Sequence, residues 1–219
     1  PIGTAAPSNE EQKAITHHFI HNKSILDKYS VGDFEREAIE CITPIHKHTP
    51  IVVLVGGSGL YVQAVLEGLD DFPEVSANIR TQLNTEFKTN GIQGLQKELK
   101  SLDPIAYETI ALDNPHRVIR ALEICRATGK AYSSFLNKEK KKRNFKTIQI
   151  GLTAERSLVY ERINRRVDLM IALGLVDEVK SVLEYKQLNA LNTVGYKEVF
   201  RYLEGHCSLD FAIEEIKKN

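Results

Sequence analysis

The chain has 219 residues, 42% of them apolar, and 29 basic side chains balance 29 acidic ones. This apolar content predicts a folded core and excludes a disordered chain. Because the chain has no net charge, a polyanion would have to bind it at a local basic patch. The three cysteines are far apart in the sequence, which argues against a disulfide framework and a zinc site and fits a reducing, cytoplasmic location. No apolar run approaches the length that spans a bilayer, so we expect no membrane association.

The first third of the chain predicts a polar loop, a helix and a buried strand. The loop runs from Pro1 to about Lys23, and apolar residues at helical spacing then follow Ser30, which is a candidate N-cap with Asp33 as the alternative. Residues 51–55 form an uninterrupted, β-branched apolar run. Such a run is typical of a strand buried on both faces of a parallel sheet. The sequence therefore predicts an α/β core.

A glycine-rich turn, Gly56-Gly57-Ser58-Gly59, follows this strand and precedes another helix. Glycines let the backbone approach a ligand closely, and the helix N-terminus behind them favours an anion. The segment lacks the Gly-Lys-Ser/Thr ending of a phosphate loop and does not fit the dinucleotide fingerprint. A tight strand-to-helix turn without a ligand is therefore the alternative. We interpret the Ser58 hydroxyl as a ligand contact and not as a nucleophile.

A helical lobe interrupts the core between residues 73 and 143. Ile79, Leu83 and Phe87 recur at four-residue spacing, and further apolar stripes follow with no strand between them. Residues 147–152 then alternate as a returning strand. We therefore predict a core made of residues 1–72 and 144–219, with residues 73–143 inserted into it.

Two helices outside the predicted sheet have clear boundaries. In the lobe, Asn114 is a candidate N-cap, Pro115 takes the first helical position and Gly129 ends the helix. In the last third, one helix ends near Gly174 and another begins after it.

Three arginines near residue 165 form the first basic feature. Arg162 and Arg166 are one helical turn apart and can fork onto phosphate oxygens, with Arg165 beside them. The alternative is a solvated face on which Glu161 and Asp168 neutralise them.

The lobe carries two further basic features. Arg117 and Arg120 share one helix face, which suits a backbone phosphate, and residues 138–143 are dense in lysine and arginine. Together with the arginines near residue 165, they make nucleic acid a plausible ligand. His17 and His18 could bind a metal, but no acidic or cysteine cluster accompanies them, so we predict no metal site in the chain.

Six segments together resemble the tRNA dimethylallyltransferases, also called tRNA isopentenyltransferases. In chain order they are "IGTAAPS", "YSVGDFEREA", "VLVGGSGLYVQAVLEGL", "DPIAYETIALDNPHRVIRALEICRATGK", "ERINRRVDLMIALGLVDEVK" and "NTVGYKEVFRYLEG". The resemblance runs in order from Ile2 to the C-terminus and is far more specific than any single motif.

The resemblance implies a fold, an activity and partners. The fold is a P-loop, nucleoside-kinase-like, nucleotide-binding parallel-sheet core with an inserted helical lobe that grips the tRNA anticodon stem-loop. The activity transfers the dimethylallyl group of dimethylallyl diphosphate to the N6 amine of the adenosine 3′ of the anticodon. Mg²⁺ is the implied cofactor, and we expect a cytoplasmic monomer.

Particular residues of this chain fall on functional positions of that family. Arg166 matches an arginine that helps hold the diphosphate, and Arg162 is a second candidate. The positions that resemble tRNA contacts are Ser58, Arg80, His116, Arg117, Val118, Ile119, Arg120, Asn192, Thr193, Val194, Gly195, Tyr196 and Lys197.

Three parts of the family pattern are absent from this sequence. The family's phosphate loop and the Asp-Ser-x-Gln segment with the general-base aspartate lie upstream of the match to Ile2, and a basic segment follows the match to residues 213–219. We therefore assign no catalytic residue here and expect the given chain alone to be inactive.

Two other interpretations are open. The first is an adenylate isopentenyltransferase or a small-molecule kinase with the same core, although a long basic helical insertion favours tRNA over a free nucleotide. The second is a non-catalytic RNA-binding module.

Overall fold

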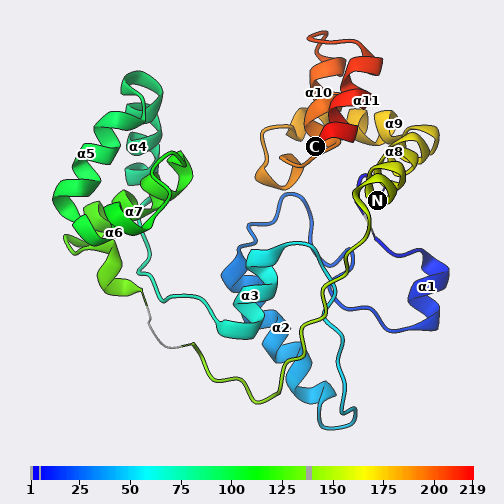
Figure 1. Cartoon of the computed structure of the whole chain (residues 1–219), viewed down its shortest axis with the longest axis horizontal. Coiled ribbons are helices and arrows are strands. Elements are labelled where there is room, and N and C mark those ends of the chain that lie inside the picture. Colours follow the sequence, from blue (N-terminus) through cyan, green and yellow to red (C-terminus); the bar gives the residue numbers. More distant parts are fainter. Residues whose placement is uncertain (1, 5, 137–139) are drawn as a thin grey trace. The chain divides into compact units, whose positions relative to one another are not determined.

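The computed structural model describes residues 2–4, 6–136 and 140–219. All regular elements in these residues are helices (Figure 1). The chain divides into two compact units: unit 1 combines Pro1–Lys28 with Ile148–Asn219, and unit 2 is Tyr29–Thr147. The domain boundaries that we predicted after residues 72 and 143 stay a prediction. No helix in the described part of the chain is long and apolar enough to cross a bilayer.

Unit 2 holds the helices of the middle of the chain. They are α2 (Val31–Ile45), α3 (Gly59–Glu67), α4 (Ala77–Asn90), α5 (Ile92–Leu102), α6 (Pro104–Thr109), α7 (Pro115–Thr128) and the 3₁₀ turn η1 (Tyr132–Phe135). We call α4–α7 with η1 the helical bundle. Its apolar core contains Leu83 of α4, Leu95 and Leu99 of α5, and Leu122 of α7, each at most 3% exposed. The predicted stripe of Ile79, Leu83 and Phe87 packs in this core.

The predicted helix boundaries in unit 2 are confirmed. Ser30 caps α2 and accepts a hydrogen bond from the Asp33 N–H, while the Asp33 carboxylate accepts one from the Ser30 N–H. The Asn114 side chain caps α7 by accepting from two backbone N–H groups, Pro115 is its first residue, and Gly129 ends it with a left-handed φ of 67°. Side-chain oxygens that satisfy the free N–H groups of a first turn explain why these sequence signals were informative.

Unit 1 holds the helices of the two ends of the chain. They are α1 (Asn9–Ala14), α8 (Arg156–Ala172), α9 (Leu175–Ser181), η2 (Leu183–Tyr185), η3 (Asn189–Leu191), α10 (Tyr196–Leu203) and α11 (Leu209–Lys218). Their core includes Val167, Leu175, Val179 and Val199, none more than 4% exposed. The predicted helix break near Gly174 separates α8 from α9.

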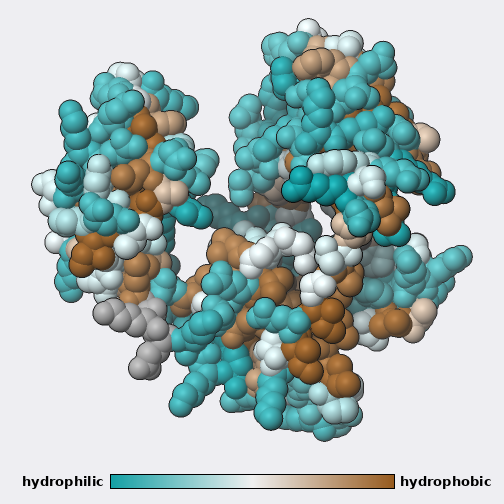
Figure 2. Space-filling model, viewed as in Figure 1, coloured by the Kyte–Doolittle hydropathy of each residue, from teal (hydrophilic) through white to brown (hydrophobic). Residues whose placement is uncertain are grey.

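The predicted parallel-sheet core, and with it the P-loop, nucleoside-kinase-like fold class, is wrong for the described residues, which contain no strand. Residues 51–55 and 147–152 have no regular secondary structure, and neither segment is paired in a sheet. Val53 and Val55 are 76% and 86% exposed, and Ile150 and Leu152 are 83% and 97% exposed. Apolar surface is accordingly visible in the lower half of the space-filling view (Figure 2).

Backbone pairing explains why the sheet prediction failed. A strand is stable only where a neighbouring strand satisfies its N–H and C=O groups. A β-branched run indicates that a segment suits burial in a sheet, but it does not supply the neighbour. Residues 51–55 and Ile150 belong to different compact units, and no second strand lies beside either segment in the described chain.

Arg126 joins three helices of the bundle through two carboxylates. From α7 it donates two hydrogen bonds to Glu86 of α4, at 2.8 and 2.7 Å, and two to Glu98 of α5, at 2.8 and 2.6 Å. Bidentate pairs of this kind are among the stronger charge-assisted hydrogen bonds. They raise the pKa of Arg126, which therefore stays charged.

We expect Arg126→Leu to lower the free energy of unfolding by about 1–3 kcal/mol, because two partly exposed carboxylates then face each other without a cation. Urea denaturation at neutral pH measures the change. Arg117→Leu is the matched control, since Arg117 is exposed and makes no ion pair within the described residues; it should shift stability by less than about 0.5 kcal/mol. Equal effects of the two substitutions would contradict the bridging role of Arg126.

Candidate functional site

The glycine turn at residues 56–59 leads into α3 without the constraints that usually require glycine. A Cβ atom at Gly56, Gly57 or Gly59 would meet no atom within 4 Å, and none of the three has a positive φ. Ser58 occupies the N-cap position of α3, but its exposed hydroxyl makes no capping hydrogen bond. The fold of the described residues therefore does not demand these glycines, and the ligand interpretation of the turn stays a prediction.

An open cavity of about 230 Å³ lies at this turn. The rings of Phe34 from α2 and Tyr61 from α3 form part of its wall, with centroids 5.2 Å apart. The Ser58 hydroxyl gives the mostly apolar lining a polar group. The lining residues are Phe34, Leu54, Val55, Gly56, Gly57, Ser58, Tyr61 and Val62.

The helical bundle carries part of the predicted tRNA-binding set. We call the surface formed by Arg80, His116, Arg117 and Arg120 its basic face. His116 and Arg117 are exposed in the first turn of α7. Val118 and Ile119 are 0% and 3% exposed and belong to the bundle core, so their side chains can only position the helix. Arg120 pairs with Glu123 at 2.9 Å, and Arg80 of α4 lies 3.9 Å from the same carboxylate.

Unit 1 contains the predicted diphosphate-binding arginines, both on α8. Arg162 and Arg166 are exposed, and neither makes an ion pair within the part of the chain that the structure describes. Asp168, a partner that the sequence suggests for them, pairs instead with Lys217 of α11 at 2.9 Å. The two guanidiniums are therefore available for an anionic ligand.

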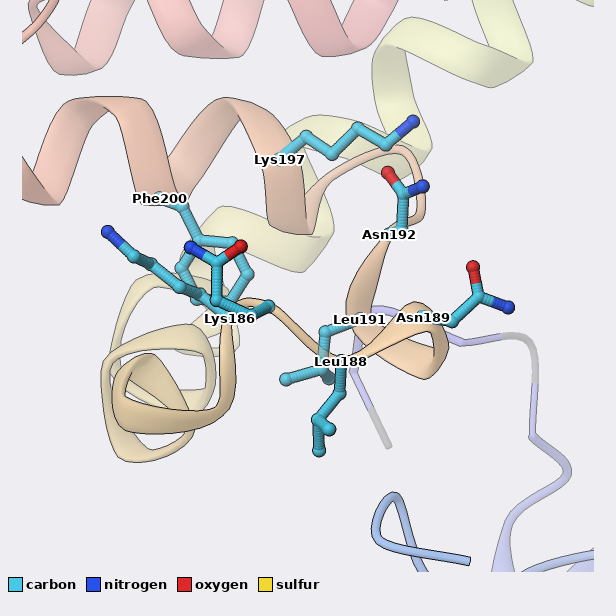
Figure 3. Close-up of a pocket in the computed structure, with 8 residues that line it drawn as sticks. Lys186, Leu188, Asn189, Leu191, Asn192, Lys197 and Phe200 are labelled. Atoms are coloured by element: carbon cyan, nitrogen blue, oxygen red, sulfur yellow. The ribbon is translucent and has the colours of Figure 1, made fainter. Parts of the chain in front are cut away.

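The predicted stretch Asn192–Lys197 links η3 to α10, and its first and last residues line a second cavity, of about 320 Å³ (Figure 3). Asn192, Thr193, Val194 and Lys197 are exposed, whereas Gly195 and Tyr196 are buried. Figure 3 shows Asn192 and Lys197 extending their polar ends away from the buried Leu191. The Lys197 ammonium makes no ion pair within the described residues, so this stretch offers amide groups and a cation to a ligand.

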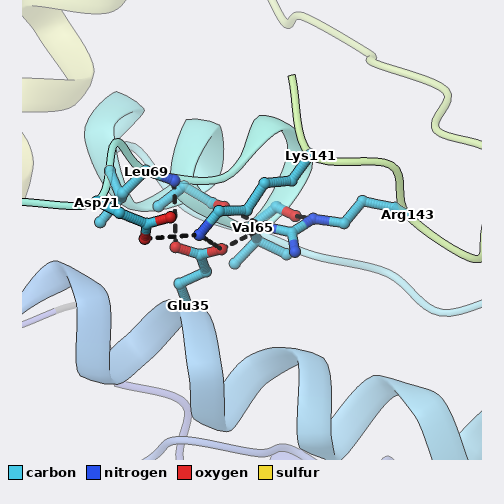
Figure 4. A network of polar contacts seen from close by, with 7 residues as sticks. Glu35, Val65, Leu69, Asp71, Lys141 and Arg143 are labelled. Atoms are coloured by element: carbon cyan, nitrogen blue, oxygen red, sulfur yellow. Dashed lines mark hydrogen bonds and ion pairs between the residues drawn. The ribbon is translucent and has the colours of Figure 1, made fainter. Parts of the chain in front are cut away.

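In the basic segment at residues 138–143, unlike at Arg162 and Arg166, cations are paired with acids of the protein. Residues 138 and 139 lie outside the described residues. Lys140 pairs with Glu67, Lys141 lies 3.4 Å from Asp71, and Arg143 pairs with Glu35 at 2.7 Å. Figure 4 shows Glu35 extending from α2 toward the side chains of Lys141 and Arg143. These three cations are thus neutralised within the protein.

Two buried, ion-paired carboxylates, Glu35 and Glu123, are not among the residues that we predicted from the sequence. Each is an acidic residue on a helix face that is otherwise buried, with side chains 12% and 5% exposed. Buried carboxylates are costly unless they are paired, so an acid among apolar neighbours at helical spacing is a usable signal for a buried ion pair. In "IRALEIC" Glu123 follows the buried Ile119 by four residues, and this helical spacing could have identified it.

No three His, Cys, Asp or Glu side chains gather as a metal site among the described residues. Mg²⁺ usually binds through one or two carboxylates together with phosphate oxygens and water, so the Mg²⁺ that the family resemblance implies stays a prediction.

Glu178 of α9 holds the buried Tyr196 of the Asn192–Lys197 stretch. Its carboxylate accepts from the Tyr196 hydroxyl at 2.7 Å and from the backbone N–H groups of Ile2 and Gly3 at 2.8 and 2.9 Å. Burial by itself raises the pKa of Glu178, but hydrogen bonds from Gly3, Ile2 and Tyr196 outweigh it and lower the pKa to about 2. The ionised carboxylate is therefore the form that the fold stabilises.

We expect Glu178 to stabilise the protein above its usual carboxyl pKa, and this contribution to disappear as pH falls toward about 2, because the folded-state pKa is the lower one. Glu178→Gln should cost about 1–3 kcal/mol of unfolding free energy near neutral pH and much less near about pH 3. Urea denaturation at both pH values measures the difference. For the exposed Glu184→Gln control we expect no such pH dependence, and a pH-independent effect of Glu178→Gln would contradict the assignment.

Comparisons with known proteins place the chain in a family. The family model described as IPP transferase matches residues 1–219. A tRNA dimethylallyltransferase of Christiangramia forsetii is 56% identical over 218 residues, which are 100% of this chain and 72% of that protein. One from Flavobacterium johnsoniae is 50% identical over an alignment of 224 positions, with 100% and 72% covered.

Solved structures agree with this assignment. The tRNA isopentenylpyrophosphate transferase of Bacillus halodurans matches with a TM-score of 0.64 and 38% identity, over 100% of this chain and 69% of its own. A eukaryotic dimethylallyltransferase, in a study of its action on tRNA, matches with a TM-score of 0.78 and 25% identity, over 100% of this chain and 56% of its own. The match of the family model to the whole sequence, together with these relatives, shows that the chain belongs to the IPP transferase family.

Proposed function

We propose that this protein is a tRNA dimethylallyltransferase that moves a dimethylallyl group from dimethylallyl diphosphate to the N6 amine of the adenosine 3′ of the anticodon. The observation that carries the proposal is the family match over residues 1–219, with relatives of up to 56% identity that bear this activity in their names. The cytoplasmic location and the monomeric state stay predictions.

The reaction exchanges one bond for another. The bond between the allylic carbon and the diphosphate oxygen breaks, a bond from the adenine nitrogen to that carbon forms, and the amine loses a proton. Negative charge grows on the departing diphosphate, so cations held beside it lower the barrier. The guanidiniums of Arg166 and Arg162, which are exposed and make no ion pair with any residue that the structure describes, support a role there. The proton acceptor is not assigned to a residue of this chain.

The base must leave its stack to present the amine, which costs a few kcal/mol and calls for a receiving cavity. The cavity at the glycine turn supports this role, because its aromatic and aliphatic walls suit a planar base or a prenyl chain and Ser58 adds a hydroxyl. His116 and Arg117 of the bundle, and Asn192–Lys197 of unit 1, are proposed to contact the tRNA.

A transfer assay tests the proposal. The protein, together with any segments that flank the given sequence, is incubated with an unmodified tRNA transcript and radiolabelled dimethylallyl diphosphate, and label in the RNA is counted. Transfer to tRNA supports the proposed function. Transfer only to free AMP would favour an adenylate isopentenyltransferase, and tRNA binding without transfer would favour an RNA-binding module.

We expect Arg166→Ala to lower kcat/KM for dimethylallyl diphosphate by about tenfold or more, because a group facing the leaving diphosphate acts mainly in the transition state. Arg117→Ala should instead raise the Kd for tRNA and reduce its salt slope by about 1. Steady-state kinetics with each substrate varied in turn, together with tRNA binding at several salt concentrations, measures both. Equal effects of both variants on both substrates would contradict this division.

The basic segment at residues 138–143, where Lys141 is paired with acids, provides a third variant. We expect Lys141→Ala to leave the Kd for tRNA within about twofold of the wild type, because its ammonium already faces Glu35 and Asp71. The same binding assay with Arg117→Ala as the responsive comparison measures it. A loss for Lys141→Ala as large as that for Arg117→Ala would show that the segment contacts RNA directly.

A further inference from the structure

Glu123 places a carboxylate among the buried residues of α7. Its side chain is only 5% exposed. A buried charge of this kind is costly unless other charges or hydrogen bonds compensate it. Its position therefore depends on partners.

Two arginines of the bundle's basic face supply that compensation. One carboxylate oxygen of Glu123 accepts a hydrogen bond from Arg120 at 2.9 Å, and the other lies 3.9 Å from the guanidinium of Arg80. Arg80 comes from α4 and Arg120 from the preceding turn of α7. Their side chains remain 54% and 40% exposed, so each guanidinium is held on its inner side and open on its outer side.

Arg120 has a second fixed contact. Its guanidinium lies 5.2 Å from the centroid of the Phe72 ring, a distance within reach of a cation–π interaction. Phe72 in turn stacks on Tyr132, with centroids 5.1 Å apart and ring planes only 8° from parallel. A carboxylate and an aromatic face thus restrain the same guanidinium.

We propose that Glu123 is a positioning residue that presents Arg80 and Arg120 as a pre-ordered pair to RNA phosphates. The inference rests on the proposed function, because it takes tRNA as the ligand. Arginine loses considerable side-chain freedom when it binds, and a pair already held in place loses less. By its charge alone, an acid on an RNA-binding face repels the RNA, so removing that charge should tighten binding. If Glu123 positions the arginines, removing its charge should instead weaken binding.

The test is Glu123→Gln, which removes the charge and keeps the size of the side chain. Simple electrostatics predicts tighter tRNA binding, whereas loss of positioning predicts binding weaker by about 3- to 10-fold. Glu108→Gln is the matched control: Glu108 is an exposed carboxylate of the same bundle, on α6, with no ion pair within the described residues. The control should bind tRNA as tightly as the wild type or slightly more tightly.

Fluorescence anisotropy of a labelled, unmodified tRNA transcript, titrated with wild type and variants at several salt concentrations, gives the Kd and its salt dependence. Arginines that no longer meet phosphates should lower the salt slope by about 1. Partial unfolding would reduce the active fraction without changing the slope, and thermal melts of each variant record it. If Glu123→Gln does not fold, Glu123→Asp serves, since it keeps the charge, retracts it by one methylene, and should also weaken binding.

The tRNA titrations test the positioning role of Glu123 separately from the proposed function. Weaker binding with a smaller slope for the Glu123 variant, together with unchanged or tighter binding for Glu108→Gln, supports the positioning role. Wild-type or tighter binding by the folded Glu123 variant overturns it and leaves the proposed function standing. If the wild-type protein does not bind tRNA, the proposed function fails and the positioning role fails with it.

Discussion

The ion pair between Glu35 and Arg143 joins two parts of unit 2 that are 108 residues apart in the sequence. Glu35 also accepts the Leu69 N–H at 3.2 Å, and Arg143 donates to the carbonyl oxygens of Ala64 and Val65 at 2.8 Å each. The chain passes Leu69 on its way to the helical bundle and passes Arg143 on its way back. One largely buried pair therefore fixes both connections, and loss of either partner would leave a buried charge.

The same pairing of acids with bases divides the cations of this chain into two groups. Lys140, Lys141 and Arg143 are neutralised by carboxylates, as is Arg126 inside the bundle. Arg117, Arg162, Arg166 and Lys197 are among the cations that make no ion pair within the described residues. With a balanced total charge, the cations that acids leave unpaired determine where a polyanion finds positive potential. A protein with no net charge can therefore still have a locally positive surface that binds RNA.

The helices and their ends were predictable because their signals are local. Ser30, Asn114, Pro115 and Gly129 act within one helical turn, and the apolar stripe that includes Leu83 reflects the helical period. The sheet was not predictable, because residues 51–55 have the composition of a strand but no partner in the described chain. Much of the candidate site followed from motifs, including the glycine turn and the arginines of α8. The acids Glu35, Glu123 and Glu178 did not, because their partners are distant in the sequence or their burial depends on packing.

The sequence by itself determined the family, the helix ends at Ser30, Asn114 and Gly129, and the residue types available to bind anions, although it predicted a loop where α1 lies. Only the tertiary structure decided which of those residues remain free. Residues 138–143 are as basic as any part of the chain, yet Lys140, Lys141 and Arg143 are held by acids on α2, on α3 and just after α3, whereas Arg166 is left open because Asp168 pairs with Lys217. Charge pairing acts through space over a few ångströms, and the spacing of residues along the chain does not reveal which charges meet.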